Sequence, residues 1–180
     1  MKTMKYFTIK PISAEDFLIL EQLDREIFPL KSQQTLFSKN TYNENAICYV
    51  AHALLNTEAN CSLSPVGYIN VSFTGLESEI LSFGVTKNYR GQGIGKSLIG
   101  LTLKNLAAVN CKSVFLEVRK SNQTARKLYS SFGFRKTGVR SNYYSDNQED
   151  AILMSLHQLQ NIEYLSFLQS TLHKLPYYSK

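Results

Sequence analysis

The sequence predicts a mixed α/β (α+β) fold built as one domain. The length of 180 residues suits a single domain of roughly 100–200 residues. Several short runs alternate apolar with polar residues, as strands do, and several longer segments repeat apolar residues every three or four positions, as helices do. An apolar run ending at Val85, a glycine-rich stretch and a helix-periodic segment over Ile94–Val109 follow one another directly, which predicts a strand, a loop and a helix.

The first half of the chain is predicted to contain four strands and two helices. Tyr6–Ile12 reads as a strand, and Ser13 is a plausible N-cap for a helix that ends at Pro29. The apolar stripe of that helix consists of Phe17, Leu20, Leu23 and Ile27. A short helix is expected over Ser32–Lys39, strands over Ile47–Leu55, Val66–Phe73 and Glu79–Val85, and a polar loop over Asn56–Pro65.

The second half is also predicted to contain both strands and helices. A strand is expected over Val114–Arg119, with Val114, Leu116 and Val118 on one side and Phe115, Glu117 and Arg119 on the other. Further expected elements are a helix from Ser121–Asn122 to Ser131, and strands over Phe134–Val139 and Ala151–Leu156 with a tyrosine-rich loop between them.

Past His157, leucines and isoleucine recur mostly every third residue up to Pro176, which predicts an amphipathic helix. We therefore expect a main domain over residues 1–156 and a helical extension over 157–180. The extension is expected to pack on the same domain, and a dimer contact or a ribosome contact stays open as an alternative.

Composition and charge exclude several functional classes. The net charge of +6 would suit a polyanion, but the basic residues are spread along the chain, which disfavours direct nucleic-acid binding. Three cysteines without CxxC spacing predict reduced packing residues in a cytoplasmic protein, with neither a metal site nor a disulfide frame. No run is long and apolar enough for a signal peptide or a membrane span.

Three glycines in alternate positions, Gly91, Gly93 and Gly95, predict a phosphate-binding loop. Glycine allows the tight turn that leaves successive N–H groups free, and the start of the following helix adds further unpaired N–H groups. A P-loop would need glycine where Arg90 stands, and a dinucleotide fingerprint would need its third glycine where Lys96 stands. Both alternatives are therefore disfavoured.

The remaining pattern, Arg90-x-x-Gly93-x-Gly95, resembles the pyrophosphate signature of the GNAT superfamily of acetyl-CoA-dependent N-acetyltransferases. Downstream, Leu116-Glu-Val-Arg-Lys-Ser-Asn, Leu128-Tyr, Gly133-Phe, Arg140-Ser-Asn-Tyr-Tyr and Glu149-Asp-Ala resemble the RimI-type branch, the ribosomal-protein-alanine N-acetyltransferases. The resemblance spans about Leu81–Leu156. It implies a mixed, mostly antiparallel, splayed sheet flanked by helices, with acetyl-CoA as cosubstrate and no metal.

The resemblance also implies site residues. It assigns cofactor binding to the strand end and the glycine loop, with Asn122 as a further candidate whose side chain could equally cap its own helix. The loop candidates are Phe83, Gly84, Val85, Arg90, Gly91, Gln92, Gly93, Ile94, Gly95 and Lys96. The backbone N–H of Val85 would polarise the thioester carbonyl. Arg140, Tyr143 and Tyr144, with Glu149 and Asp150, would either line the acceptor cleft or hold the last hairpin.

Two side chains are candidates for proton transfer. Glu117 could draw a proton from the acceptor amine directly or through a water, or it could simply pair with Arg119 or another cation. Tyr129 could protonate the leaving sulfur, or it could be a core residue of its helix. The resemblance favours the catalytic interpretation of both.

The function expected from the sequence is acetyl transfer to a protein N-terminal amine, most specifically the alanine of a small-subunit ribosomal protein. A monomer or weak dimer without a membrane partner is expected. Acetylation of a small amine or of a lysine remains an alternative, as does a module that binds acyl-CoA without turnover.

Overall fold

The computed structural model describes residues 7–12, 16–28, 45–56 and 61–175. The expected Ser13 cap and the short helix expected over Ser32–Lys39 lie outside these ranges. The strands are β1 (Phe7–Pro11), β2 (Ala46–Asn56), β3 (Cys61–Phe73), β4 (Glu77–Val85), β5 (Ser113–Arg119), β6 (Arg135–Tyr144) and β7 (Glu149–Leu156). The helices are α1 (Phe17–Ile27), η2 (Lys87–Tyr89, a single 3₁₀ turn), α2 (Ile94–Ala108), α3 (Gln123–Ser131) and α4 (Ile162–His173).

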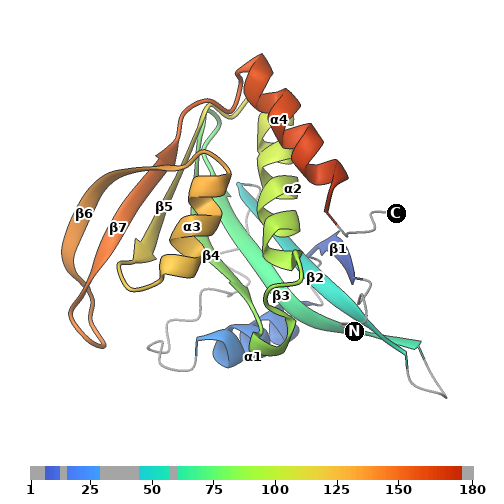
Figure 1. The fold of residues 1–180 in the computed structure, drawn as a ribbon. Coiled ribbons are helices and arrows are strands. Elements are labelled where there is room, and N and C mark those ends of the chain that lie inside the picture. The colour runs from blue at the N-terminus through green and yellow to red at the C-terminus, as the bar shows by residue number, and fades with distance from the viewer. Residues whose placement is uncertain (1–6, 13–15, 29–44, 57–60, 176–180) are drawn as a thin grey trace.

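The strands form one open sheet in the order β1-β2-β3-β4-β5-β7-β6 (Figure 1). Only the pairing of β4 with β5 is parallel among the described strands, and α2 connects these two strands across one face of the sheet. A mixed, mostly antiparallel sheet with flanking helices and an additional C-terminal helix is thereby confirmed.

A β-bulge at Leu81 splits the middle of the sheet. Ile80 pairs with Val71 and Ser82 pairs with Asn70, so Leu81 is one extra residue in β4. The pairing of β4 with β5 ends at Ile80, whereas β5 stays paired with β7 as far as Arg119. The two strands then diverge toward the bottom of Figure 1, as expected for a splayed sheet.

The bulge also reverses the facing of the side chains that follow it. Ile80 packs in the core under α2, and so do Phe83 and Val85, although an odd spacing would normally place residues 80 and 83 on opposite faces. Because the extra residue shifts the alternation by one position, the apolar side chains before and after the bulge all face the same core.

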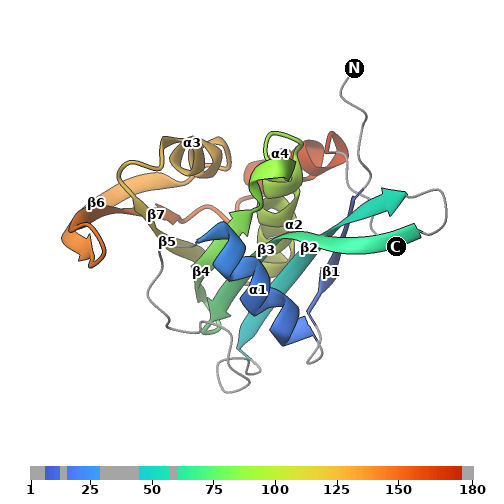
Figure 2. The same ribbon diagram turned by 90° about the horizontal axis from the view of Figure 1, so that it is seen from below.

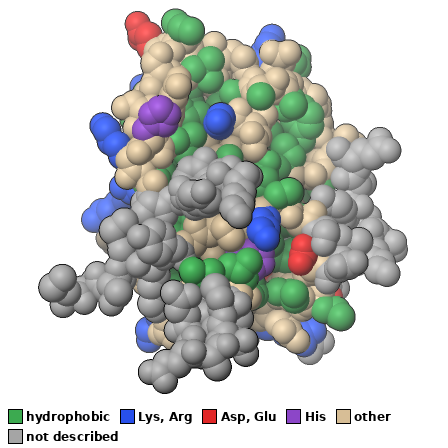
Figure 3. All heavy atoms as spheres, turned by 90° about the vertical axis from the view of Figure 1, so that its right-hand side faces the viewer, with side chains coloured by type: hydrophobic (Ala, Val, Ile, Leu, Met, Phe, Trp, Pro, Cys, Tyr) green, Lys and Arg blue, Asp and Glu red, His purple; other side chains and the backbone are tan. Residues whose placement is uncertain are grey.

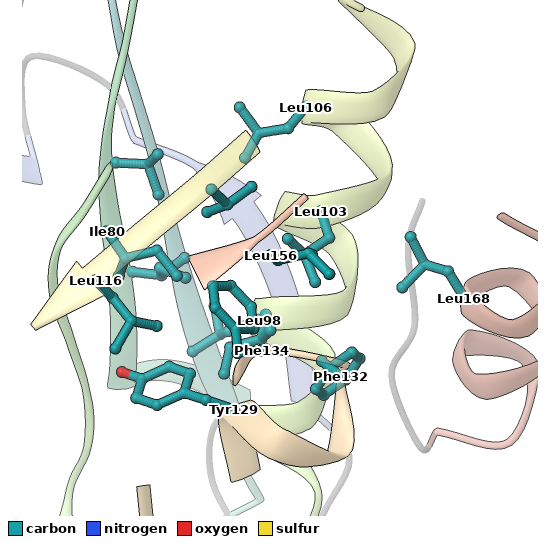
Figure 4. Close-up of a cluster of buried hydrophobic side chains, with 14 of the residues drawn as sticks. Ile80, Leu98, Leu103, Leu106, Leu116, Tyr129, Phe132, Phe134, Leu156 and Leu168 are labelled. Carbon is teal, nitrogen blue, oxygen red and sulfur yellow. The ribbon is translucent and has the colours of Figure 1, made fainter. Parts of the chain in front are cut away.

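Two apolar cores lie on the two faces of the sheet. The larger core is covered by α2, α3 and α4, and includes Leu98, Leu103 and Phe132 (Figure 4). The smaller core lies under α1, where Leu20 and Leu23 meet Tyr68. Figure 2 shows α1 on one side of the sheet, and α3 and α4 on the other.

The C-terminal helix packs closely against α2. A Cβ placed on Gly100 would lie 2.8 Å from the Leu172 side chain, so a larger residue there would force Leu172 to move. Asn161 caps α4 by accepting from the N–H groups of Glu163 and Tyr164, and the Tyr164 hydroxyl donates to the Phe132 carbonyl at 2.7 Å. The predicted amphipathic helix is confirmed, and it starts three residues later than the leucine repeat suggests.

Two loop predictions were wrong. The loop expected over Asn56–Pro65 is mostly strand, because β2 and β3 continue as a hairpin from the pair Asn56 and Cys61. Pro65 is tolerated inside β3 since the register shifts next to it, and a residue at a bulge can lack an N–H donor. The expected tyrosine-rich loop is also largely strand, since β6 extends to Tyr144, with a second irregularity after Arg140.

Candidate active site

The glycine loop joins the open end of β4 to α2. Gly91 has φ 74° and Gly93 has φ 89°, a left-handed backbone that glycine adopts without steric cost. Gly93 is the N-cap of α2, and the N–H groups of Ile94, Gly95 and Lys96 follow it in the first turn, where a helix offers no internal acceptor. The loop therefore presents consecutive N–H donors at the positive end of a 15-residue helix.

Side chains of the loop stabilise the loop itself. The Arg90 Nε donates to the Val85 carbonyl at 2.8 Å, and the Gln92 Nε2 donates to the Asn88 carbonyl at 3.1 Å. A Cβ on Gly95 would lie 3.1 Å from the Phe83 ring, so this glycine lets the helix start pack on β4. Lys96 is exposed. The donors available to an anion are thus mainly backbone N–H groups.

The split sheet leaves one edge of β4 open. The Thr86 N–H donates to the Val66 carbonyl of β3, and successive N–H groups of a strand alternate in direction, so the Val85 N–H points to the opposite edge. The backbone groups of Phe83 point to that edge as well. Those of Gly84 point to β3, and its missing side chain serves packing, because a Cβ there would lie 2.5 Å from Ile27.

Glu117 lies on β5 beside this split. Its neighbours Leu116 and Val118 are buried in the larger core, so Glu117 points to the opposite face of the sheet. The Glu117 carboxylate forms an ion pair with Arg140 Nη1 at 2.6 Å, and the Glu117 side chain is 17% exposed. Of the cations considered from the sequence, the partner is therefore Arg140 on β6 and not Arg119.

A pocket of about 320 Å³ opens at Glu117 on the α1 face of the sheet. Its lining includes Glu79, Phe115 and Arg140. Tyr143 lies next to the ion pair, since the Arg140 guanidinium is 5.0 Å from its ring centroid. A hydrogen bond to Glu117, followed by burial, raises the pKa of Tyr143. The structure thus brings together Glu117, Arg140 and Tyr143.

Tyr129 approaches the split from the other face. It is buried on α3, with its ring centroid 6.0 Å from that of Phe83 and 5.8 Å from that of Phe134. Its hydroxyl points away from Phe132 (Figure 4), and no hydrogen-bond partner for it occurs among the described residues. Burial raises the pKa of Tyr129 well above its ordinary value, so the phenol keeps its proton.

Asn122 caps α3. Its Oδ1 accepts from the Ala125 N–H at 3.1 Å, so this oxygen is already engaged within its own helix. Its side-chain NH₂ group remains as a donor on the exposed start of the helix.

A polar cluster that the sequence did not reveal holds the β6–β7 hairpin. Arg119 donates to both carboxylate oxygens of Asp146, at 3.0 and 2.9 Å, and lies 3.3 Å from Glu149. Its guanidinium stacks 3.9 Å above the Tyr144 ring, and burial raises the pKa of Tyr144 to about 12. No sequence motif pointed to Asp146, because its partner Arg119 is 27 residues away along the chain.

Glu149 and Asp150 belong to this structural cluster. Glu149 accepts from the Ser121 N–H at 2.6 Å, and Asp150 pairs with Lys120 at 3.1 Å. Both carboxylates therefore tie the hairpin to the start of α3. Of the two roles that the sequence left open, these two residues and Tyr144 hold the hairpin, whereas Arg140 and Tyr143 lie beside Glu117.

Comparison with known proteins decides the family. Residues 15–134 match the sequence profile of the Acetyltransferase (GNAT) family. The chain belongs to the GNAT family. The GNAT signature and the RimI-type resemblance inferred from the glycine loop and the segment after Leu116 are confirmed.

The relatives of this GNAT chain include a ribosomal-protein N-acetyltransferase and an uncharacterized N-acetyltransferase. The [ribosomal protein bS18]-alanine N-acetyltransferase of Escherichia coli K12 is 38% identical over 82 residues, which cover 44% of this chain and 55% of that relative. The chain thus spans about half the length of this curated relative. The uncharacterized N-acetyltransferase MJ1530 of Methanocaldococcus jannaschii is 35% identical over 150 residues, covering 81% of this chain and 88% of that protein.

Solved GNAT structures share the fold. The E. coli ribosomal-protein-S18-alanine N-acetyltransferase superposes with a TM-score of 0.71 at 24% identity, over 83% of this chain and 92% of that chain. Arabidopsis thaliana NAA60, solved in complex with acetyl-CoA, superposes with a TM-score of 0.72 at 23% identity, over 83% and 97% of the two chains.

The geometry of this GNAT chain fits the cosubstrate of its family. GNAT acetyltransferases use acetyl-CoA, whose pyrophosphate requires clustered donors and whose pantetheine contains amide groups. The left-handed Gly91 and Gly93 and the start of α2 supply the donors. The open edge of β4 at Phe83 and Val85 supplies strand-like partners for the amides.

Two further findings concern the described residues only. No helix in the ranges that the structure describes is long and apolar enough to cross a membrane. Within the same ranges, no group of three or more His, Cys, Asp or Glu side chains is arranged to hold a metal ion.

The environment of Glu149 predicts a pH-dependent contribution to stability. Hydrogen bonds from Ser121 and further bonds from Asn147 and Arg119 lower the pKa of Glu149 from 4.5 to about 2. A lowered folded-state pKa stabilises the fold above the unfolded-state value, and the contribution disappears as the pH falls toward the folded-state value. Urea unfolding of the wild type and of Glu149→Gln should therefore differ by a constant amount above about pH 4.5 and converge toward pH 2. A difference that stays constant between pH 5 and pH 2 would contradict this assignment.

Proposed function

We propose that this protein transfers an acetyl group from acetyl-CoA to the N-terminal α-amino group of a protein, most specifically to the N-terminal alanine of a small-subunit ribosomal protein. The observation that carries the proposal is the bulge at Leu81, which opens the edge of β4 directly beside Glu117 of β5. A donor site and a carboxylate thereby meet at one gap in the sheet. The named bS18-alanine N-acetyltransferase of E. coli supports the choice of acceptor.

The residues of the chain have separate roles in this proposal. Acetyl-CoA supplies the acetyl group as a thioester, held by the N–H groups of the glycine loop and the open edge of β4. The Val85 N–H points to that edge and donates a hydrogen bond to the thioester carbonyl, where negative charge develops. Glu117, on the opposite face, accepts the proton that the acceptor ammonium must lose before its nitrogen can attack.

Tyr129 stabilises the leaving sulfur. An ordinary thiol has a pKa of about 8.5, far below that of a buried phenol, so complete proton transfer from Tyr129 to a thiolate is unfavourable. The hydroxyl instead donates a hydrogen bond as the carbon–sulfur bond breaks. The proton that completes the thiol comes from water or from the carboxyl group of Glu117 after it has accepted the proton of the amine.

Arg140 controls the carboxylate before the acceptor arrives. In the structure its guanidinium satisfies Glu117 at 2.6 Å, and its side chain is 56% exposed. An exposed cation can leave at little cost, because pairs near solvent contribute only ~0–1 kcal/mol. An incoming α-ammonium replaces Arg140 as the partner of Glu117, and Tyr143 keeps a hydrogen bond to the carboxylate.

The choice of an α-amine over a lysine follows from acidity. An N-terminal amine has a pKa of about 7.7–8.0, whereas a lysine has one of about 10.4, so a carboxylate base suffices only for the former at neutral pH. The proposal therefore predicts strong selectivity for N-termini, without a stronger base in the site.

Acetylation of synthetic peptides tests the proposal. We expect rapid acetyl transfer to a decapeptide with a free N-terminal alanine and an internal lysine, and a rate at least ~100-fold lower for the same peptide with a blocked N-terminus, given the difference in amine acidity. Mass spectrometry locates the acetyl group. Preferential acetylation of the lysine, or of free polyamines in a parallel assay, would refute the proposed acceptor, and tight acetyl-CoA binding without any transfer would refute an enzymatic role.

A further inference from the structure

A basic groove lies between α3 and the β6–β7 end of the sheet, apart from the glycine loop. It has a volume of about 730 Å³. Four cationic side chains line it: Arg126 and Lys127 from α3, and Arg135 and Lys136 from the start of β6. No carboxylate contributes to the lining. We call this site the α3 groove.

The fold brings together two pairs of adjacent basic residues. Arg126 and Lys127 lie on the face of α3 opposite to the core residues Ala125, Leu128 and Tyr129. The chain then turns at Gly133, whose φ is 87°, and β6 brings its first two residues back alongside the helix. Two basic pairs nine residues apart along the chain thus line one hollow.

Charge on the face shown in Figure 3 is arranged differently. On the face shown in Figure 3, Lys and Arg side chains lie singly among apolar and uncharged ones. In the α3 groove, Lys127, Arg135 and Lys136 are exposed, and no ion pair involves them within the part of the chain that the structure describes. Their charges are therefore available to an outside partner.

The groove has a second chemical feature, an apolar part of its lining. Phe134, Ile152 and Met154 contribute this part. A strand of single-stranded nucleic acid has the complementary design, with phosphates that pair with Arg and Lys and bases that contact apolar surface. A membrane surface fits less well, since the site is concave and the large exposed apolar side chains of the described residues do not line it.

We propose that the α3 groove binds the phosphodiester backbone of single-stranded RNA. Two of its four cations are arginines, whose planar guanidinium groups match phosphate oxygens in pairs. The inference does not depend on the proposed acetyl transfer, because it concerns another face of α3. RNA and acetyl-CoA are expected to bind at the same time.

Two matched triple variants separate a built groove from net charge. The groove variant is Lys127→Ala/Arg135→Ala/Lys136→Ala. The control variant is Lys104→Ala/Lys112→Ala/Lys174→Ala, three exposed lysines outside the groove. Each variant removes three positive charges from the net charge of +6. Circular dichroism and Tm confirm that both fold, and Lys127→Arg/Lys136→Arg provides a second, charge-retaining groove variant.

The measurement is fluorescence anisotropy of a labelled 12-nucleotide RNA of mixed sequence, with acetyl-CoA at saturation and KCl between 50 and 200 mM. We expect the wild type and the charge-retaining variant to bind with salt-dependent affinity. The groove variant should bind at least ~10-fold more weakly, with a salt slope lower by about 2, because three lost phosphate contacts contribute about 0.7 each. The control variant should lose no more than ~2-fold.

Several results would overturn the proposal. Equal loss in the groove and control variants would mean that net charge alone binds RNA. Loss of RNA binding on addition of acetyl-CoA would assign the groove to the coenzyme tail. Stronger binding of a polyglutamate peptide than of RNA, or binding to vesicles of anionic phospholipid in the absence of RNA binding, would assign it to a different class of partner.

Discussion

Replacing Glu117 with Gln is expected to lower kcat/KM for an N-terminal alanine peptide by a factor of ~10²–10⁴, the usual contribution of a positioned proton acceptor. Gln keeps the size of the side chain and can still receive a hydrogen bond from Arg140, but it cannot take a proton. The loss should be greatest below pH 7, where most of the acceptor amine carries its proton. Initial rates between pH 6 and pH 9 measure this dependence.

Glu79→Gln is the matched control for this experiment. Glu79 lines the same pocket from β4, and its side chain is exposed. Both variants lose one carboxylate from the pocket, and only Glu117 lies in the ion pair with Arg140. The control should keep its rate within ~2-fold. A wild-type rate for Glu117→Gln, or an equal loss in both variants, would remove Glu117 from the proton-transfer step.

Replacing Gly91 with Val is expected to weaken acetyl-CoA binding by ~10-fold or more. The φ of 74° places a β-branched residue in a strongly disfavoured region, at a cost of ~1–2 kcal/mol that the loop can relieve only by moving. Such a movement misaligns the N–H groups of the glycine loop and of the first turn of α2. Titration calorimetry with acetyl-CoA measures the change in Kd.

Gly75→Val provides the same strain at a distance from the loop. Gly75 lies in the turn between β3 and β4 with φ 85°, and a Cβ there, as at Gly91, would meet nothing within 4 Å. Both variants should lower Tm by a similar amount, whereas only Gly91→Val should change acetyl-CoA affinity. If the two variants bind acetyl-CoA equally well, the loop does not hold the pyrophosphate.

Much of the fold could be predicted because local patterns determine it. The alternation over Val114–Arg119 correctly separated the core face from the face of Glu117. The helix after the glycine loop was predicted to within one residue of its end. Both segments have clear periodicity, and the helix also has Gly93 and Asn110 at its boundaries; these signals are local.

The failures concern long-range pairing. The hairpin formed by β2 and β3 continues through a polar stretch that resembles a loop, because its backbone hydrogen bonds do not depend on apolar side chains. The partner of Glu117 was equally hidden, since Arg119 is two residues away in the sequence and Arg140 is 23 residues away, and only the sheet order selects the distant cation. The bulge at Leu81 has no signal in a single sequence, because its definition requires the register of β3.

Because of that bulge, the opening of the sheet depends on the number of residues in β4. Leu81 is 46% exposed, so most side chains could stand at this position. Removing the residue altogether would instead make Ile80 and Ser82 consecutive in the existing register, keep Phe83 and Val85 on the core side, and allow β4 to continue its pairing with β5. Substitutions here should therefore be tolerated, while a one-residue deletion would remove the bulge, straighten the strand and seal the gap. The architecture of the cleft is encoded in chain length at a single point and not in the chemistry of the residue found there.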